Sequence, residues 1–179
     1  EASDDPTVFP SKAISRMNIE HHENDTDTKE SGDLIEQACH HLSRGRNDNA
    51  LQALRDALLH AREKLNCAKQ DKDDFYFQKK LPIDEEDELE DEQEDRLDAN
   101  LRSAASEMAN ILNNIGVVYE LEGEYHRAMN SFRDALDVYR KMCHRYENAG
   151  DCDVDKTVNN IMQMGLAMKT HEKRQGLHN

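Results

Sequence analysis

The chain has 179 residues, 34% of them charged, and a formal net charge of −15. This acidic balance argues against a nucleic acid as partner, because a protein that binds nucleic acid needs a basic surface to displace counterions from the phosphates. An anionic membrane surface is disfavoured for the same reason, and the lack of any run of about 18 apolar residues predicts no insertion into a membrane. Hydrophobic residues make up 36% of the chain and only 3 residues are proline, which favours a small all-α core.

The four cysteines form neither a CxxC pair nor a recognisable disulfide framework. Free thiols in a reducing compartment, such as the cytoplasm or the stroma of an organelle, are therefore expected. Cys143 and Cys152 flank a turn signal at Gly150, and whether they approach each other is left open. The chain starts with Glu rather than Met, so an upstream targeting segment can be missing and no compartment is assigned.

Histidines are numerous, but their spacing does not suit a metal ion. Neighbours on a helix, such as His21-His22 or His40-His41, point about 100° apart and make a poor chelate. The sequence also has no HExxH motif, no Gly-rich phosphate loop and no recognisable Ser or Cys nucleophile. We therefore expect no metal, no cofactor and no enzymatic activity. A small enzyme or cofactor carrier stays a third hypothesis, supported only by the surplus of histidines.

Residues 1–30 are polar and acidic, and they contain two of the prolines. Such a segment cannot bury enough apolar surface to offset the entropy of ordering it. We expect an extended, disordered N-terminal arm. A few of its apolar residues could still dock on another surface, namely Val8, Phe9, Ile14, Met17 and Ile19. The alternative is a solvated tail.

Residues 31–66 predict a helical hairpin. Its first helix is expected to begin at Ser31 or Asp33, since Glu36 completes a capping box with Asp33. Gly45 marks the turn. The second helix carries leucines on one stripe, at Leu51, Leu54, Leu58 and Leu65.

Residues 67–95 interrupt this helical pattern. Phe75, Tyr76 and Phe77 stand together in a charged stretch, and residues 84–95 are acidic at ten of twelve positions. Repulsion between like charges predicts a disordered or solvated loop unless a partner neutralises it. We expect this acidic loop to attract a basic partner and the three aromatic residues to anchor that partner. The alternative is a loop that only keeps the protein soluble.

Residues 96–148 predict a second hairpin, whose first helix is unusually long and whose turn lies at Gly123. The small residues Gly116 and Ala128 let the two helix backbones approach closely, and Tyr125 can cover the seam. A last helix is expected at residues 151–173, with a short tail at 174–179. No partner helix follows it, so it is expected to cap the stack.

The segment 109–142 resembles a tetratricopeptide repeat, whose period is about 34 residues. The signature positions hold Ile115-Gly116, Tyr119, Gly123, Tyr125, Ala128, Phe132 and Ala135, while Leu112 replaces the preferred Trp and Arg140 the frequent Pro. Residues 158–161 repeat residues 112–115 after 46 positions, a spacing near the longer repeats of the kinesin light chain. The resemblance implies an all-α, short stack of helical hairpins with degenerate flanking repeats and a C-terminal capping helix.

The resemblance also implies a binding site. The first helices of such repeats line a concave groove, where an asparagine often grips the main chain of a peptide through its amide donor and acceptor. Asn114 and Asn160 occupy that position here. The candidate partner-binding residues are Asn113, Asn114, Val117, Asn159, Asn160 and Gln163 in the groove and Phe75, Tyr76 and Phe77 in the acidic loop. The alternative is that these asparagines are exposed helix residues without a ligand.

From these features we expect a non-catalytic scaffold module that binds a protein partner, either basic or an extended peptide, through its groove. The runner-up is a structural subunit of a larger multiprotein assembly, held by its arm and its outer faces. A chaperone-tail adaptor is not expected, because Ile35 and Cys39 stand where the clamp for a C-terminal carboxylate needs Lys and Asn.

Overall fold

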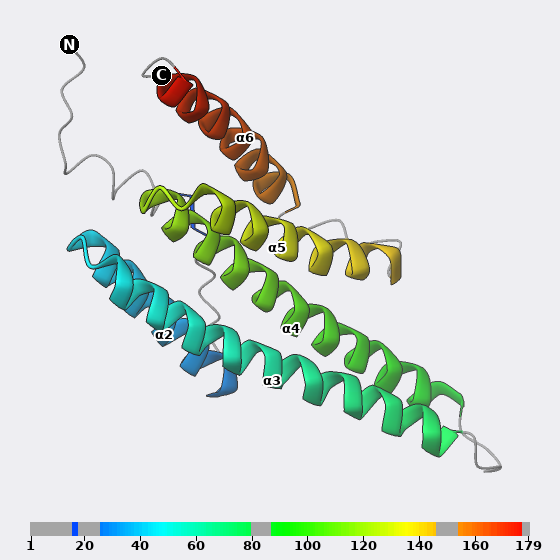
Figure 1. The fold of residues 1–179 in the computed structure, drawn as a ribbon. Helices are drawn as coiled ribbons and strands as arrows, with labels where there is room; N and C mark the ends of the chain where they lie inside the picture. The colour runs from blue at the N-terminus through cyan, green and yellow to red at the C-terminus, as the bar shows by residue number, and fades with distance from the viewer. Residues whose placement is uncertain (1–15, 18–25, 80–86, 146–153, 177–179) are drawn as a thin grey trace.

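The structure is a computed structural model that describes residues 16–17, 26–79, 87–145 and 154–176. The described helices are α2 (Thr26–Ser43), α3 (Asn47–Lys79), α4 (Asp87–Leu121), α5 (Tyr125–Arg145) and α6 (Val154–Gly176). They stack in chain order, with the α2/α3 pair, the α4/α5 pair and α6 as successive layers (Figure 1). No strand occurs within the described ranges. The predicted all-α stack of helical hairpins with a final capping helix is confirmed.

Both hairpins close at the glycines that the sequence predicted. Gly45 has a φ of 68° and Gly123 a φ of 75°, in the left-handed region that a side chain disfavours. Each glycine N–H donates to a carbonyl three residues earlier, Gly45 to Leu42 at 2.9 Å and Gly123 to Glu120 at 3.0 Å. Each turn therefore satisfies a terminal carbonyl of its first helix while reversing the chain.

The close approach of α4 and α5 depends on the absence of a side chain at Gly116. A Cβ atom at this position would lie 2.5 Å from the ring of Phe132, which is fully buried on α5. Ala128, one turn before Phe132, is fully buried as well. The seam is therefore built as the sequence predicted, with small residues where the two backbones meet.

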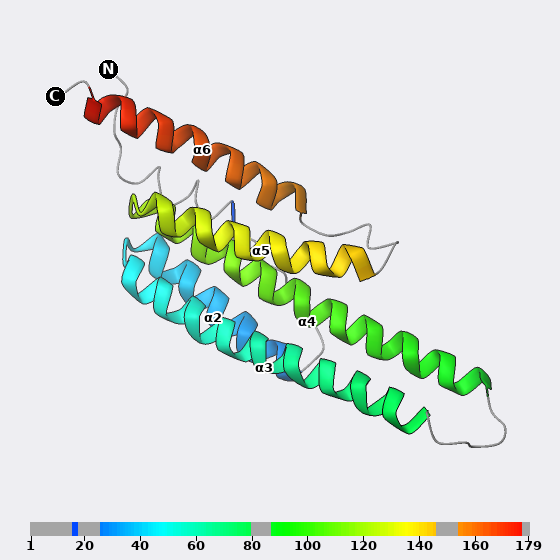
Figure 2. The same ribbon diagram turned by 45° about the vertical axis from the view of Figure 1, so that its right-hand side comes forward.

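One apolar cluster joins residues of all five described helices, and Met17 belongs to it. A smaller second cluster lies further along α3 and α4 and consists of Leu65, Ala68, Leu101, Ala104 and Ala105. Figure 2 shows that α3 and α4 continue side by side past the ends of α2 and α5. We call this continuation, residues 65–79 with residues 87–105, the α3–α4 extension. Val138 of α5 packs against the inner end of the second cluster.

The first helix begins earlier than predicted. Helix α2 starts at Thr26, so Ser31 is not its cap but a buried residue inside it. Ser31 and Asp33 were thus the wrong capping residues, and the predicted arm is helical from Thr26 onward. A helix start needs only a residue suited to the cap and a stretch free of helix breakers, and the sequence offers both at residues 26–30.

The predicted acidic loop is the larger correction. Residues 67–79 continue α3 and residues 87–95 begin α4, so both ends of the expected loop are helical, and residues 80–86 lie outside the described ranges. Lysines of α3 pair with carboxylates of the antiparallel α4: Lys64 with Glu107 at 3.1 Å, Lys72 with Asp98, and Lys79 with Glu94 at 3.9 Å. Only the last of these pairs involves the acidic run itself, so one of its carboxylates lies beside a cation of the neighbouring helix, a contact that the local sequence did not reveal.

Helix α6 forms the outer layer of the stack and lies close to the predicted residues 151–173. It packs mainly on α5, and Met164 is its fully buried contribution to the core. Met162 and Leu166, on its other side, are exposed. The division of the chain into arm, hairpins, loop and cap as separate units stays a prediction.

Candidate functional site

Two asparagines predicted for the groove meet in the interior, one from α4 and one from α6. The Asn160 Nδ2 donates to the Asn113 Oδ1 at 2.9 Å, and the Thr157 hydroxyl donates to the same oxygen at 3.4 Å. Asn113 has no exposed surface and Asn160 is 3% exposed. This pairing links α4 to α6 through polar groups rather than through apolar packing alone.

The pairing leaves one polar group of Asn113 unused. Its Nδ2 is buried and has no hydrogen-bond partner among the described residues. A buried donor without a partner costs free energy, on the order of 1–3 kcal/mol, so such groups are retained where a ligand or a positioning role compensates. Asn113 therefore keeps one buried donor that no described residue uses.

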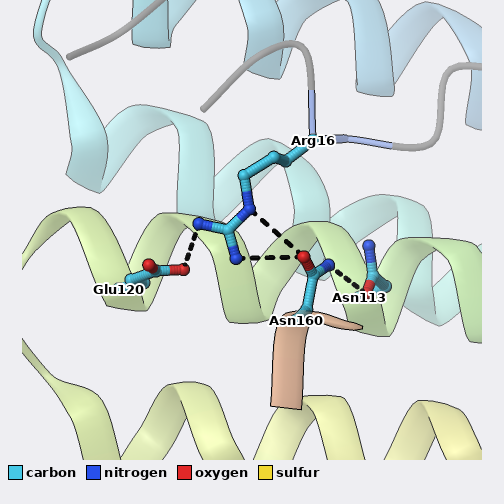
Figure 3. Close-up of polar contacts among 4 residues, drawn as sticks. All are labelled: Arg16, Asn113, Glu120 and Asn160. Atoms are coloured by element: carbon cyan, nitrogen blue, oxygen red, sulfur yellow. Dashed lines mark hydrogen bonds and ion pairs between the residues drawn. The ribbon is translucent and has the colours of Figure 1, made fainter. Parts of the chain in front are cut away.

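Arg16, from the short described piece at residues 16–17, lies directly on Asn160 (Figure 3). The guanidinium Nε and Nη2 both donate to the Asn160 Oδ1, at 3.2 and 3.0 Å. The third nitrogen, Nη1, lies 2.7 Å from the Glu120 Oε2 of α4, in the geometry of an ion pair rather than of a directed hydrogen bond. The two charged side chains are 24% and 21% exposed, so water screens their attraction in part.

Met17 fixes the same piece of chain to the core. It is 3% exposed and belongs to the main apolar cluster, and its carbonyl oxygen accepts from the Lys156 Nζ at 3.3 Å. The prediction that Met17 could dock is confirmed. The other apolar arm residues named for docking lie outside the described ranges, namely Val8, Phe9, Ile14 and Ile19.

The remaining predicted groove residues divide by burial. Asn114 and Val117 of α4 are buried, whereas Asn159 and Gln163 are exposed on α6. The structure thus brings Asn113 and Asn160 together and leaves Asn159 and Gln163 at the surface. Their roles in partner binding stay predictions.

The three aromatic residues predicted as anchors lie at the α3–α4 extension and have different surroundings. Phe75 is half-buried and lines a pocket with Arg96 and Leu97 of α4. The Tyr76 hydroxyl donates to the Glu94 carboxylate, and this hydrogen bond raises the pKa of Tyr76. Phe77 alone is well exposed, at 73%. Two of the three aromatic side chains therefore contact α4, and one is available at the surface.

Sequence reasoning missed the residues that complete the site, which are Arg16, Glu120, Lys156 and Thr157. The bond from Arg16 to Asn160 joins positions 144 residues apart, and no local pattern announces such a contact. The only available signal was Arg16 itself, a cation next to an apolar residue within a mainly acidic arm.

Other chemistry finds little support in the described ranges. There, no three His, Cys, Asp or Glu side chains come close enough to hold a metal ion. No described helix is long and apolar enough to cross a membrane. Cys39 and Cys67 are free thiols, and burial raises the pKa of the Cys39 thiol, which disfavours its nucleophilic thiolate form.

Antiparallel helix pairs that close at glycines, pack through small residues and stack in chain order define a helical repeat protein. Residues 108–143 match the family model of the tetratricopeptide repeat, so the chain contains a tetratricopeptide repeat over this segment. This segment spans the end of α4 and nearly all of α5 and therefore includes Asn113 and Glu120. The likeness to the kinesin light chain stays a prediction.

No curated protein and no solved structure among those compared matches the chain significantly. The repeat itself indicates a protein-protein interaction module, because stacked repeats of this kind form concave binding surfaces.

Proposed function

We propose that this chain is a non-catalytic scaffold module that holds a segment of a partner protein on the face formed by α4 and α6. One observation carries the proposal: this face already holds polypeptide. Arg16 and Met17 lie on it through one side chain, one buried apolar group and one main-chain carbonyl. These are the kinds of contact that an extended segment of another protein would make.

Charge supports the same proposal and narrows the partner. The chain carries a net charge of −15, and the site itself contains the Glu120 carboxylate. An acidic surface attracts basic segments over long range and speeds their association. A basic, extended partner segment is therefore the best fit.

A peptide array tests the proposal. The full chain is applied to immobilised short peptides of varied sequence, in parallel with the variants Asn160→Ala and Asn159→Ala. We expect the parent and Asn159→Ala to be retained by a common set of peptides and Asn160→Ala to lose them, since Asn160 contacts Arg16 while Asn159 is exposed. Circular dichroism must show that both variants keep the helicity of the parent. Retention that is the same for all three proteins would place binding elsewhere.

The second candidate function is a structural subunit of a larger multiprotein assembly. It is favoured by large apolar side chains exposed on the outer faces of the helices, which are Leu59, Phe77, Met162 and Leu166. A subunit should co-purify in fixed proportion with its neighbours at high salt, whereas a scaffold module should come off alone. Stoichiometric co-purification together with an empty peptide array would favour the subunit.

A further inference from the structure

We propose that the face between α4 and α6 selects an arginine followed by an apolar residue, and that Arg16–Met17 is a displaceable occupant supplied by the chain itself. This inference rests on the proposed function, because it names the ligand class of the same site. The ligand is a basic segment of a partner protein whose Arg and following apolar side chain replace Arg16 and Met17.

The orientation of Asn160 determines what the site can read. Its Nδ2 is already committed to the Asn113 Oδ1, and Asn113 is held from the other side by the Thr157 hydroxyl. The Asn160 Oδ1 lies toward Arg16, and an amide oxygen can accept hydrogen bonds but not donate them. An acceptor of this kind selects a donor such as a guanidinium. A free asparagine would instead bind a main-chain peptide group through both its donor and its acceptor.

The second polar element of the site selects arginine over lysine. Glu120 contacts one guanidinium nitrogen while the Asn160 Oδ1 takes hydrogen bonds from the other two (Figure 3). A planar fork with five N–H groups reaches both acceptors at once, whereas a single ammonium group cannot match this geometry. Glu120 belongs to α4 and Asn160 to α6, so the guanidinium contacts two helices that come together only in the folded stack.

The apolar part of the signature follows from Met17. Its side chain is 3% exposed and packs within the main apolar cluster, while Lys156 binds its carbonyl at 3.3 Å. Methionine is unbranched and adapts to irregular space, so other unbranched or γ-branched apolar residues can fill the same position. Lys156 adds a main-chain contact that does not depend on the identity of the residue.

The Arg16 part of the occupant is suited to displacement, whereas Met17 leaves a buried position that the apolar side chain of the partner segment fills in its place. The Arg16 side chain is 24% exposed, and the contact with Glu120 is an ion pair that water screens. Only residues 18–25 separate the occupant from the start of α2. A short tether gives an effective concentration on the order of millimolar, so an occupant whose own Kd for the site is about 0.1 mM would weaken the apparent binding of a competing partner segment about tenfold.

The test uses the full chain and a synthetic peptide with the chain's own sequence from Lys12 to His21. The full chain is prepared as the variants Arg16→Ala and Arg16→Ala/Met17→Ser, and the binding of the peptide to each protein is measured by isothermal titration calorimetry. We expect the peptide to bind the double variant about tenfold or more tightly than the parent. Peptides that carry Arg16→Lys or Arg16→Ala should bind the double variant about tenfold or more weakly than the unchanged peptide, since they lose charge-assisted hydrogen bonds. A double variant that keeps its helicity but binds all three peptides alike would overturn the proposal.

A second measurement tests the proposal without the double variant, in case that variant fails to fold. The Nε–H signal of Arg16 is followed by NMR in the otherwise unchanged full chain while the same peptide is added. Displacement should move this signal to the position of a free arginine at millimolar peptide, and the peptide with Arg16→Ala should leave it in place. A signal that stays in place with both peptides would show that residues 16–17 are a fixed part of the core, which overturns the proposal.

The outcomes separate this inference from the proposed function. If the array retains peptides without an Arg-apolar pair and Asn160→Ala abolishes this retention, the ligand class is wrong and the interaction face stands. If no peptide binds the parent or the double variant, both are wrong.

Discussion

At Gly116 the ring of Phe132 lies against the backbone of α4, and only a hydrogen atom fits between them. Gly116→Ala places a Cβ atom 2.5 Å from the ring, and Phe132 has no exposed surface toward which it could move. We expect this overpacking to lower the free energy of unfolding by ~1–3 kcal/mol. Thermal and urea unfolding followed by circular dichroism measure the change.

Gly165 is the matched control, because it lies inside α6 with no atom within 4 Å of an added Cβ. Gly165→Ala should stabilise the protein by up to ~1 kcal/mol, since alanine loses less conformational freedom in a helix than glycine. Equal effects of the two substitutions would contradict the assigned contact between Gly116 and Phe132.

Glu122, beside the α4–α5 turn, is an acidic residue in unfavourable surroundings. Its side chain is exposed at the surface, yet desolvation by its neighbours is the largest cause that raises its pKa. The carboxylates of Asp48 and Glu124 add to this rise, and Arg55 and Arg127 oppose it in part. A carboxyl whose pKa is higher in the folded than in the unfolded protein favours folding below the unfolded pKa and loses this contribution as the pH rises through the folded pKa. Ionised Glu122 therefore opposes folding at neutral pH.

We expect Glu122→Gln to raise the melting temperature at pH 7 and to approach the parent as the pH falls to the range where the carboxyl is protonated. Differential scanning calorimetry over this pH range measures the effect. Glu63→Gln, at an exposed position of α3, serves as a control. An advantage of Glu122→Gln that is the same at every pH would point to a cause other than charge.

At the scale of the elements, the outer end of the α3–α4 extension depends on contacts between its two helices, because α3 and α4 run on past α2 and α5 (Figure 2). Helix α5 reaches only the inner end, where Val138 packs against the second cluster. Phe75 lines the pocket shared with α4, whereas Phe77 is exposed. Phe75→Ala should therefore increase amide hydrogen exchange at residues 91–100, and Phe77→Ala should leave it unchanged. Mass spectrometry of the exchanged protein measures this difference. Equal exchange in the two variants would mean that Phe75 does not hold the helices together.

The elements that the sequence predicted well are those encoded locally. The two turns need a left-handed residue and have glycine there, and the α4–α5 seam needs small residues at helical spacing and has Gly116 and Ala128. The prediction of a loop at the acidic start of α4 was wrong, and the contacts that α3 makes with this start, from Tyr76 and Lys79 to Glu94, arise only from the antiparallel pairing of the two helices. A run of like charge shows its own repulsion but not the side chains that another helix places beside it.

The candidate site was predictable in part for the same reason. A repeat pattern selected Asn113 and Asn160, which do meet in the structure. The repeat pattern did not show that one amide would commit its donor to the other, nor that Arg16 would take the remaining oxygen. Such assignments depend on the distance between α4 and α6, and that distance is a property of the folded stack.

At the scale of the whole molecule, a stack in which each helix mainly contacts its chain neighbours should not unfold evenly. Helix α6 is the outer layer and packs mainly on α5, while α4 packs on both α3 and α5. We expect native-state hydrogen exchange to be faster in α6 than in the second half of α4, and Gly165→Ala to slow it in α6 first. Exchange at one common rate in both helices would indicate a single cooperative unit.

Helix α4 is continuous from the α3–α4 extension to the Arg16 site, so a tilt at one end of the helix displaces the other end. Glu94 and Glu120 lie on the same helix, about 39 Å apart along its axis at ~1.5 Å per residue. A tilt of about 3° at the Glu94 end displaces the Glu120 end by about 2 Å, which is enough to separate a pair of charged groups in contact. A molecule that binds α4 near Glu94 would thus weaken the contact between Arg16 and Glu120 without touching Arg16.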